Sequence, residues 1–186
     1  MRARDIPNLI TLFRIVLVVP VVLALLAEHY LLALLLAVVA GLSDGIDGWL
    51  ARRFDWHSRL GAILDPIADK LLLVSCYLSL GWVGVLPSWL VVLVIGRDLV
   101  ILTGAVAYHL LIGRLQVEPT LISKLNTFFQ IVLVVAVMIS LGLYPLTPSL
   151  LQTLLYAVAV STIISGSHYV WVWSRRALAS WHGKVA

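Results

Sequence analysis

The sequence predicts an all-α integral membrane protein with six transmembrane helices. Of its 186 residues, 62% are hydrophobic and only 12% are charged, and the mean hydropathy is +1.06. A soluble domain of this length would be about half apolar and a quarter charged. The length accommodates about six spans of roughly 20–25 residues joined by short loops, without room for a separate soluble domain. We therefore expect a single membrane domain over residues 1–186.

Apolar runs separated by short polar stretches define the expected spans. A short interfacial segment at 1–8 precedes spans at about 9–27, 30–50, 58–82, 87–112, 121–143 and 150–172, and a basic tail follows. A basic start before an apolar run is also typical of a signal peptide. We favour a first span because Arg14 interrupts the run, no A-x-A cleavage site follows, and further spans come after it.

Connections that carry lysine or arginine alternate with connections that carry none. The first group comprises the N-terminus, 51–59, 113–124 and the C-terminal tail, and the second comprises 28–30, 81–88 and 142–149. Because basic residues favour the cytoplasmic side, six spans place both termini and the 51–59 loop in the cytoplasm. The same rule accounts for the net charge of +4, since the basic residues form no stripe that would indicate nucleic-acid binding.

Four aspartates stand around the loop between the second and third spans. Asp44 and Asp47 are three residues apart, and Asp65 and Asp69 are four apart, so on helices each pair lies on one face. If the two helix ends form a hairpin, the four carboxylates meet in one pocket. Ionisable side chains in a membrane span are costly and indicate a functional site.

Four converging carboxylates repel one another, and either protonation or divalent cations would relieve this repulsion. All-oxygen ligand sets suit Mg²⁺ or Mn²⁺, and two such ions about 4 Å apart could clamp a diphosphate during an in-line displacement. Arg52 and Lys70 would add positive charge for phosphate oxygens. The alternatives are solvated helix caps, or a proton-coupled transporter, which would more often show an internal repeat. An EF-hand fails because two loop positions lack ligands.

The pattern D-x2-D-G-x2-A-R-x8-G-x3-D-x3-D over residues 44–69 matches the signature of the CDP-alcohol phosphatidyltransferases at every defined position. The chain therefore resembles that family. The resemblance implies a homodimer whose active site holds two Mg²⁺ or Mn²⁺ ions and the diphosphate of CDP-diacylglycerol. It implies that Asp44, Asp47 and Asp65 are metal ligands and that Asp69 is a ligand or the general base. The residues implied for the nucleotide pocket are Gly48, Ala51, Arg52 and Gly61.

The reaction implied by this resemblance is phosphatidyl transfer. Asp69 takes the proton from an acceptor hydroxyl, the hydroxyl attacks the phosphorus that bears the diacylglycerol, and CMP leaves. We expect the site to face the cytoplasm from a bacterial inner membrane or an organellar equivalent. Two other classes stay open: an intramembrane prenyltransferase, which would need more helices, and a small ion or proton transporter.

Three further stretches bear on the acceptor alcohol. The first, IPNLITLFR, resembles the start of both phosphatidylglycerophosphate synthases and CMP-forming cardiolipin synthases. Its Asn8, Thr11 and Arg14 share roughly one helix face and could reach the nucleotide or make polar contacts within the helix bundle. The other two stretches, GRDL and PTLISKLNT, look more like the cardiolipin synthases.

Phosphatidylglycerol is the expected acceptor, with glycerol 3-phosphate as the alternative. Phosphatidylglycerophosphate synthases tend to have Arg-Glu in place of Arg97-Asp98, and a second lysine in place of Asn126. That lysine would help to hold a doubly charged phosphomonoester, whereas Arg97 and Lys124 could suffice for a singly charged phosphodiester. The alternatives are an ion pair of Arg97 with an aspartate and a membrane-surface anchor for Lys124. The candidates for the acceptor headgroup are Arg97, Lys124, Asn126 and Lys70.

Overall fold

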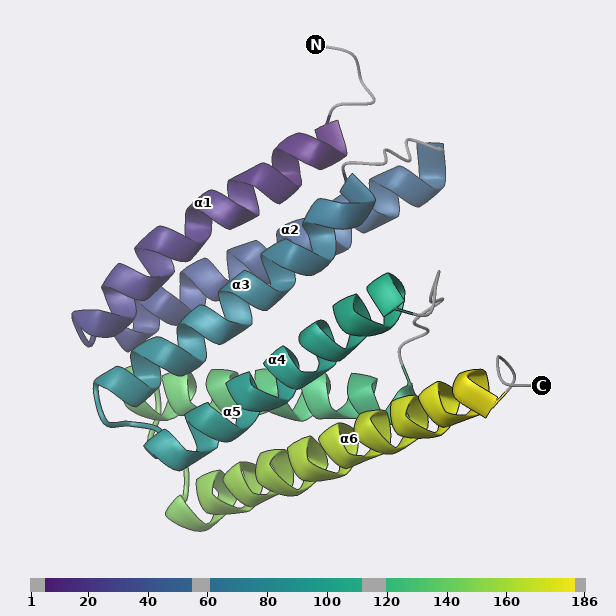
Figure 1. Ribbon diagram of the computed structural model, residues 1–186. Helices are drawn as coiled ribbons and strands as arrows, with labels where there is room; N and C mark the ends of the chain where they lie inside the picture. The colour runs from purple at the N-terminus through teal and green to yellow at the C-terminus, as the bar shows by residue number, and fades with distance from the viewer. Residues whose placement is uncertain (1–5, 55–60, 112–119, 183–186) are drawn as a thin grey trace. The chain divides into compact units, whose positions relative to one another are not determined.

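The computed structural model describes residues 6–54, 61–111 and 120–182, and within these ranges it is all-helical, with no strand (Figure 1). The helices are α1 (Ile6–Leu26), α2 (Tyr30–Phe54), α3 (Gly61–Trp82), α4 (Ser88–Leu111), α5 (Leu121–Gly142) and α6 (Pro148–His182). The predicted all-α fold of six helices is confirmed, and most helix ends fall within a few residues of the expected spans.

Two helices extend well beyond the predicted spans. Helix α2 continues to Phe54, into the expected basic loop, and α6 continues to His182, through most of the expected basic tail. Hydropathy shows where an apolar run ends, but a helix can continue into polar sequence that contains no proline or glycine. At the other end of the chain, α1 begins at Ile6, inside the expected interfacial segment, since Pro7 is tolerated in a first helical turn.

Within the described ranges, three helices contain a stretch that is long and apolar enough to cross a membrane: Leu9–Leu26, Leu121–Gly142 and Pro148–Val172. A shorter apolar stretch, Tyr30–Ile46, lies in α2. Together with the composition of the chain, these helices identify an integral membrane protein. Membrane crossing by α2, α3 and α4 stays a prediction, as do the cytoplasmic position of the termini and the single-domain organisation.

The described helices group into two compact units, and each is considered by itself. The first unit contains α1, α2, α3 and the part of α5 from Val134 onward. Helix α1 packs against both α2 and α3 (Figure 1). One face of α1 is buried along its length, at the spacing of a helix; its residues are Thr11, Arg14, Leu17, Val21, Ala24 and Leu25. This buried face is polar near the N-terminus of α1 and apolar beyond it.

The end of α5 lies directly against the start of α2 within the first unit. A Cβ atom added at Gly142 would lie 2.5 Å from the backbone nitrogen of Leu31 and 2.9 Å from its Cα atom. Side chains do not adopt such short contacts with backbone atoms. Glycine is therefore required at position 142 by the close approach of two helices.

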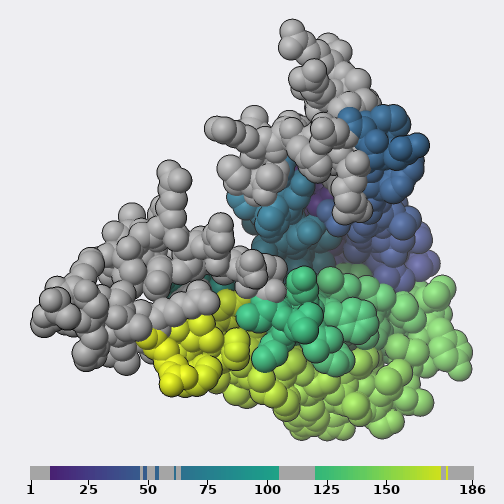
Figure 2. Space-filling model, turned by 90° about the vertical axis from the view of Figure 1, so that its right-hand side faces the viewer, coloured from purple at the N-terminus to yellow at the C-terminus, as the bar shows by residue number. Residues whose placement is uncertain are grey.

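The second unit contains α4, α5 up to Leu133, and α6. Helix α4 packs against α6, and the first turns of α5 lie beside the C-terminal part of α6 on the face shown in Figure 2. The unit buries apolar side chains, including Leu90, Val94 and Val158, and also several polar ones. Buried polar groups require hydrogen-bond partners, so polar contacts between helices contribute to the packing of this unit.

We expect Gly142→Ala to lower the stability of the protein, because the added methyl group would force α5 away from α2. Overpacking of this kind costs about 1–3 kcal/mol, which would appear as a lower midpoint of thermal unfolding in detergent. The matched control is Gly41→Ala in α2, where a Cβ atom meets nothing within 4 Å. The control should be neutral or stabilising, since alanine favours helix. Equal stability of the two variants would contradict the close approach.

Candidate functional site

Two aspartates of the signature contact the same nitrogen of Arg14. Arg14 Nη1 lies 2.7 Å from Asp44 Oδ1 of α2 and 2.8 Å from Asp69 Oδ1 of α3. The side chain of Arg14 is 0% exposed, whereas those of Asp44 and Asp69 are 45% and 56% exposed. Each of the two helices that carry the signature thus brings one aspartate to the same point on α1.

A third aspartate contacts α1 one helical turn away. The Thr11 hydroxyl donates a hydrogen bond of 2.6 Å to Asp65 Oδ1, and Thr11 is only 1% exposed on the buried face of α1. On α3, Asp65 precedes Asp69 by one turn, and both Asp44 and Asp65 repel the Asp69 carboxylate electrostatically. Helix α1 therefore organises three of the four aspartates of the signature.

The remaining candidate residues of this unit are described in part. Gly61 is buried at the start of α3, Gly48 is partly buried in α2, and Lys70 is partly buried next to Asp69. The side chains that lie outside the described part of the structure are those of Asp47, Ala51, Arg52 and Asn8. Their predicted roles accordingly stay predictions.

The donor chemistry of this site fits a hard divalent cation. Carboxylates supply only oxygen ligands, which Mg²⁺ and Mn²⁺ prefer. Asp44 and Asp69 keep about half of their side-chain surface exposed while each contacts Arg14, so carboxylate surface remains for a ligand. Among the described residues, no group of three or more His, Cys, Asp or Glu side chains is placed to hold a metal ion by itself. Asp47, the fourth expected ligand, is outside that set.

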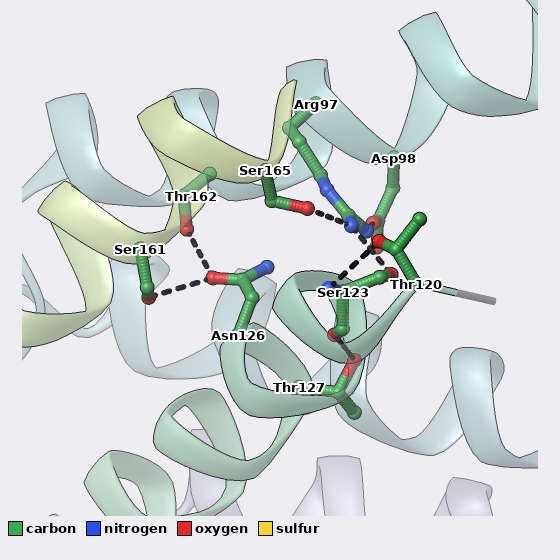
Figure 3. Close-up of polar contacts among 9 residues, drawn as sticks. All are labelled: Arg97, Asp98, Thr120, Ser123, Asn126, Thr127, Ser161, Thr162 and Ser165. Atoms are coloured by element: carbon green, nitrogen blue, oxygen red, sulfur yellow. Dashed lines mark hydrogen bonds and ion pairs between the residues drawn. The ribbon is translucent and has the colours of Figure 1, made fainter. Parts of the chain in front are cut away.

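The second unit contains a buried polar cluster at the meeting of α4, α5 and α6 (Figure 3). Arg97 is 8% exposed, and its Nη1 lies 2.8 Å from Asp98 Oδ1. Its Nη2 donates to Ser123 Oγ at 2.7 Å and also to Ser165 Oγ, and its guanidinium lies 5.7 Å from the ring centroid of Tyr169. The contact with Asp98 is the kind of ion pair that the sequence left open as an alternative to headgroup binding.

Asn126 and Lys124 lie two residues apart on α5 but in different surroundings. Asn126 is 0% exposed, and its Oδ1 accepts hydrogen bonds of 2.9 Å from the hydroxyls of both Ser161 and Thr162 on α6 (Figure 3). Its Nδ2 is buried and finds no hydrogen-bond partner among the described residues. Lys124, in contrast, is exposed. Asn126 thus ties α5 to α6, whereas Lys124 is accessible to a ligand.

Two sets of contacts were not foreseen from the sequence. One is the pairing of Arg14 with aspartates far along the chain. The sequence feature that could have indicated it is a single cation inside an apolar run, in a protein that has several acidic residues in its expected spans. The other is the hydroxyl face of α6, formed by Ser161, Thr162 and Ser165. Its signal is the spacing of three hydroxyl side chains within about one turn of an apolar helix.

A family model for CDP-alcohol phosphatidyltransferases matches residues 4–165. The match includes the whole signature, all of α1 to α5 and about half of α6. The chain belongs to the CDP-alcohol phosphatidyltransferase family. This confirms the resemblance that the signature indicated.

The relatives carry two kinds of name. The chain is 32% identical over 181 residues to a cardiolipin synthase (CMP-forming)/mitochondrial hydrolase fusion protein of Schizosaccharomyces pombe, covering 88% of this chain and 30% of the relative. It is 34% identical over 185 residues to a probable cardiolipin synthase (CMP-forming) of Drosophila melanogaster, covering 89% and 56%. It is 35% identical over 179 residues to a probable phosphatidylglycerophosphate synthase of Mycobacterium tuberculosis, covering 91% and 81%. The chain thus spans less than two thirds of the length of the first two relatives.

We expect Asn126→Ala to destabilise the fold, because the buried Thr162 hydroxyl would lose its acceptor, whereas Ser161 keeps the Val158 carbonyl at 3.1 Å. The loss of a buried polar partner costs about 1–3 kcal/mol and would lower the midpoint of thermal unfolding. Lys124→Ala is the matched control on the same helix, and it should leave the midpoint unchanged because Lys124 is exposed. If both variants were as stable as the native chain, Asn126 would not join α5 to α6.

Proposed function

We propose that the chain moves the phosphatidyl group of CDP-diacylglycerol to an alcohol and releases CMP. The observation that carries this proposal is the contact of Asp44, Asp65 and Asp69 with α1, through Arg14 and Thr11. These contacts gather acidic side chains from both halves of the family signature in an integral membrane protein. Membership of the CDP-alcohol phosphatidyltransferase family supports the same chemistry.

We propose that Asp44, Asp47, Asp65 and Asp69 hold two Mg²⁺ or Mn²⁺ ions, as the family resemblance implies. When bound, such ions neutralise the diphosphate and the charge that develops on its oxygens during transfer. The exposed surface of the Asp44 and Asp69 side chains supports this role, since it leaves both carboxylates open to a ligand. The residues proposed for the nucleotide are Gly48, Ala51, Arg52, Gly61, Asn8 and Thr11. The role of Thr11 would be indirect, since its hydroxyl donates a hydrogen bond to Asp65.

The proposed chemical step uses Asp69 as the general base. The acceptor hydroxyl gives its proton to the Asp69 carboxylate as its oxygen forms a new bond to the phosphorus that bears the diacylglycerol. The bond from that phosphorus to the oxygen bridging the two phosphates breaks, and the electron pair leaves with CMP. Asp69 is suited to this role because its side chain is 56% exposed while Arg14 holds one of its oxygens.

We propose that this site faces the cytoplasm, where the soluble product CMP would be released, and that both termini lie on the same side. The distribution of basic residues supports this orientation. A bacterial inner membrane or an organellar equivalent is the proposed location. The family resemblance also implies a homodimer, which we propose as the assembled state.

Phosphatidylglycerol is the acceptor that we propose, with formation of cardiolipin. Arg97 has its own carboxylate partner, since Nη1 lies 2.8 Å from Asp98 Oδ1, so the pair offers little net positive charge to an anion. Among the described candidates on α4 and α5, Lys124 is thus the exposed cation. This arrangement suits a singly charged phosphodiester better than the doubly charged phosphomonoester of glycerol 3-phosphate, which stays the second candidate. Lys70 and Asn126 complete the proposed acceptor set.

Purified protein in detergent with CDP-diacylglycerol and Mn²⁺ should release CMP when an alcohol is added. We expect cardiolipin as the lipid product with phosphatidylglycerol, and less phosphatidylglycerophosphate with glycerol 3-phosphate, each identified by mass. A larger yield with glycerol 3-phosphate would reverse the acceptor assignment. No CMP with either alcohol would contradict the proposed function and leave the prenyltransferase and transporter classes to be tested.

Asp69→Asn should nearly abolish turnover, because the amide cannot accept the proton of the acceptor hydroxyl. The expected decrease is a factor of about 10²–10⁴. Nucleotide binding should persist, since the substitution preserves the size of the side chain and one of its oxygens. The two quantities are measured as CMP release and as binding of labelled CMP. Glu28→Gln, which alters an exposed carboxylate between α1 and α2, is the control and should leave both unchanged. Persistent turnover in Asp69→Asn would remove Asp69 as the base.

A further inference from the structure

Arg14 and a divalent cation would draw on the same carboxylates. One oxygen of Asp44 and one of Asp69 lie 2.7 Å and 2.8 Å from Arg14 Nη1. A carboxylate has two oxygens, so each aspartate can contact the guanidinium with one and a cation with the other. The two positive charges would then stand on either side of the same carboxylates, a few ångströms apart.

We propose that Arg14 is a positioning residue with two opposed effects on the aspartates. Its contacts draw Asp44 and Asp69 together and offset their mutual repulsion, while its charge weakens the binding of a divalent cation to the same carboxylates. This inference rests on the cation site of the proposed function. It predicts a negative coupling between Arg14 and the cation, so that each lowers the stabilisation that the other provides.

The burial of Arg14 limits the screening of its charge by water, while the carboxylates that it contacts are 45% and 56% exposed. Its side chain is 0% exposed, and charges that water does not reach are screened much less than surface charges. The neighbouring contact on α1 is different in kind, because Thr11 is neutral and donates a hydrogen bond to Asp65 without adding charge. The charge that opposes the cation from α1 is therefore that of Arg14, while both residues fix the positions of aspartates.

The coupling is measured by the affinity for Mn²⁺ of the full chain in detergent, without substrate, from the electron paramagnetic resonance signal of free Mn²⁺. Arg14→Gln removes the charge and should bind Mn²⁺ about tenfold more tightly than the native chain. Arg14→Lys keeps the charge and should stay within about threefold of the native affinity. Arg97→Gln is the matched control, since Arg97 is also buried and also paired with an aspartate, and it should leave the affinity unchanged.

Thermal unfolding gives an independent reading of the same coupling. Without divalent cations, Arg14→Gln should lower the midpoint by about 5 °C or more, because the aspartates then repel one another without a counter-ion. With saturating Mn²⁺, most of this loss should be regained. A residue that only joined helices would lower the midpoint equally in both conditions, as we expect for Arg97→Gln.

The outcomes separate this inference from the proposed function. If the native chain binds no divalent cation, both fail. If the native chain binds Mn²⁺ but Arg14→Gln binds it equally or more weakly, the cation site stands and the coupling is wrong. If Arg14→Gln folds only when Mn²⁺ is present, the coupling holds in its strongest form. If Arg14→Gln does not fold in either condition, the inference fails, because saturating Mn²⁺ should restore most of the stability lost with the charge.

Discussion

The first unit depends on the contact between one buried guanidinium and the carboxylates of two other helices. Four aspartates in a chain of mean hydropathy +1.06 would be costly without a compensating charge. Arg14 supplies such a charge from α1, and its contacts with Asp44 and Asp69 join α1 to α2 and α3. Without Arg14, the carboxylates of Asp44 and Asp69, which are 45% and 56% exposed, would repel each other with no counter-charge from α1. Helix packing and the charge balance of the candidate site therefore rest on the same contact.

Much of the fold could be predicted from the sequence, but the buried faces of the helices could not. Hydropathy located all six helices, and the spacing of the aspartates indicated one face of each motif helix. In a membrane protein, however, lipid is as apolar as the core, so buried and exposed positions carry the same residue types. On α1, Leu17 and Val21 are buried, whereas Leu12 and Val16 are exposed. Only polar residues such as Arg14 distinguish the buried side of such a helix.

The partners of the candidate residues were predictable only where they are local. Asp98 follows Arg97 in the sequence, so an ion pair between Arg97 and an aspartate could be considered from the start, and the structure contains one. The partners of Arg14 lie on other helices, and no spacing rule links α1 to α2 or α3. Asn126 shows the same limit. Its position suggested a role toward the acceptor, but whether it faces a substrate or the hydroxyls of α6 depends on the rotation of α5 about its axis, which the sequence does not determine.

Arg14 and Arg97 are both buried, but the carboxylates that compensate their charges come from different places in the fold. Arg97 is compensated by its neighbour on α4, so the charge of this pair is balanced within a single helix, however the other helices pack around it. The described carboxylate partners of Arg14 come from α2 and α3, so this compensation depends on the packing of α1 against both helices. The charge of the proposed cation site is therefore set by the assembly of three helices. A change that separates α1 from α2 or α3 would alter both the position of the aspartates and their net charge, even if it lay far from the signature. We infer that residues on the apolar part of the buried face of α1, such as Leu25, influence the candidate site through this assembly, although they contribute no ligand to it.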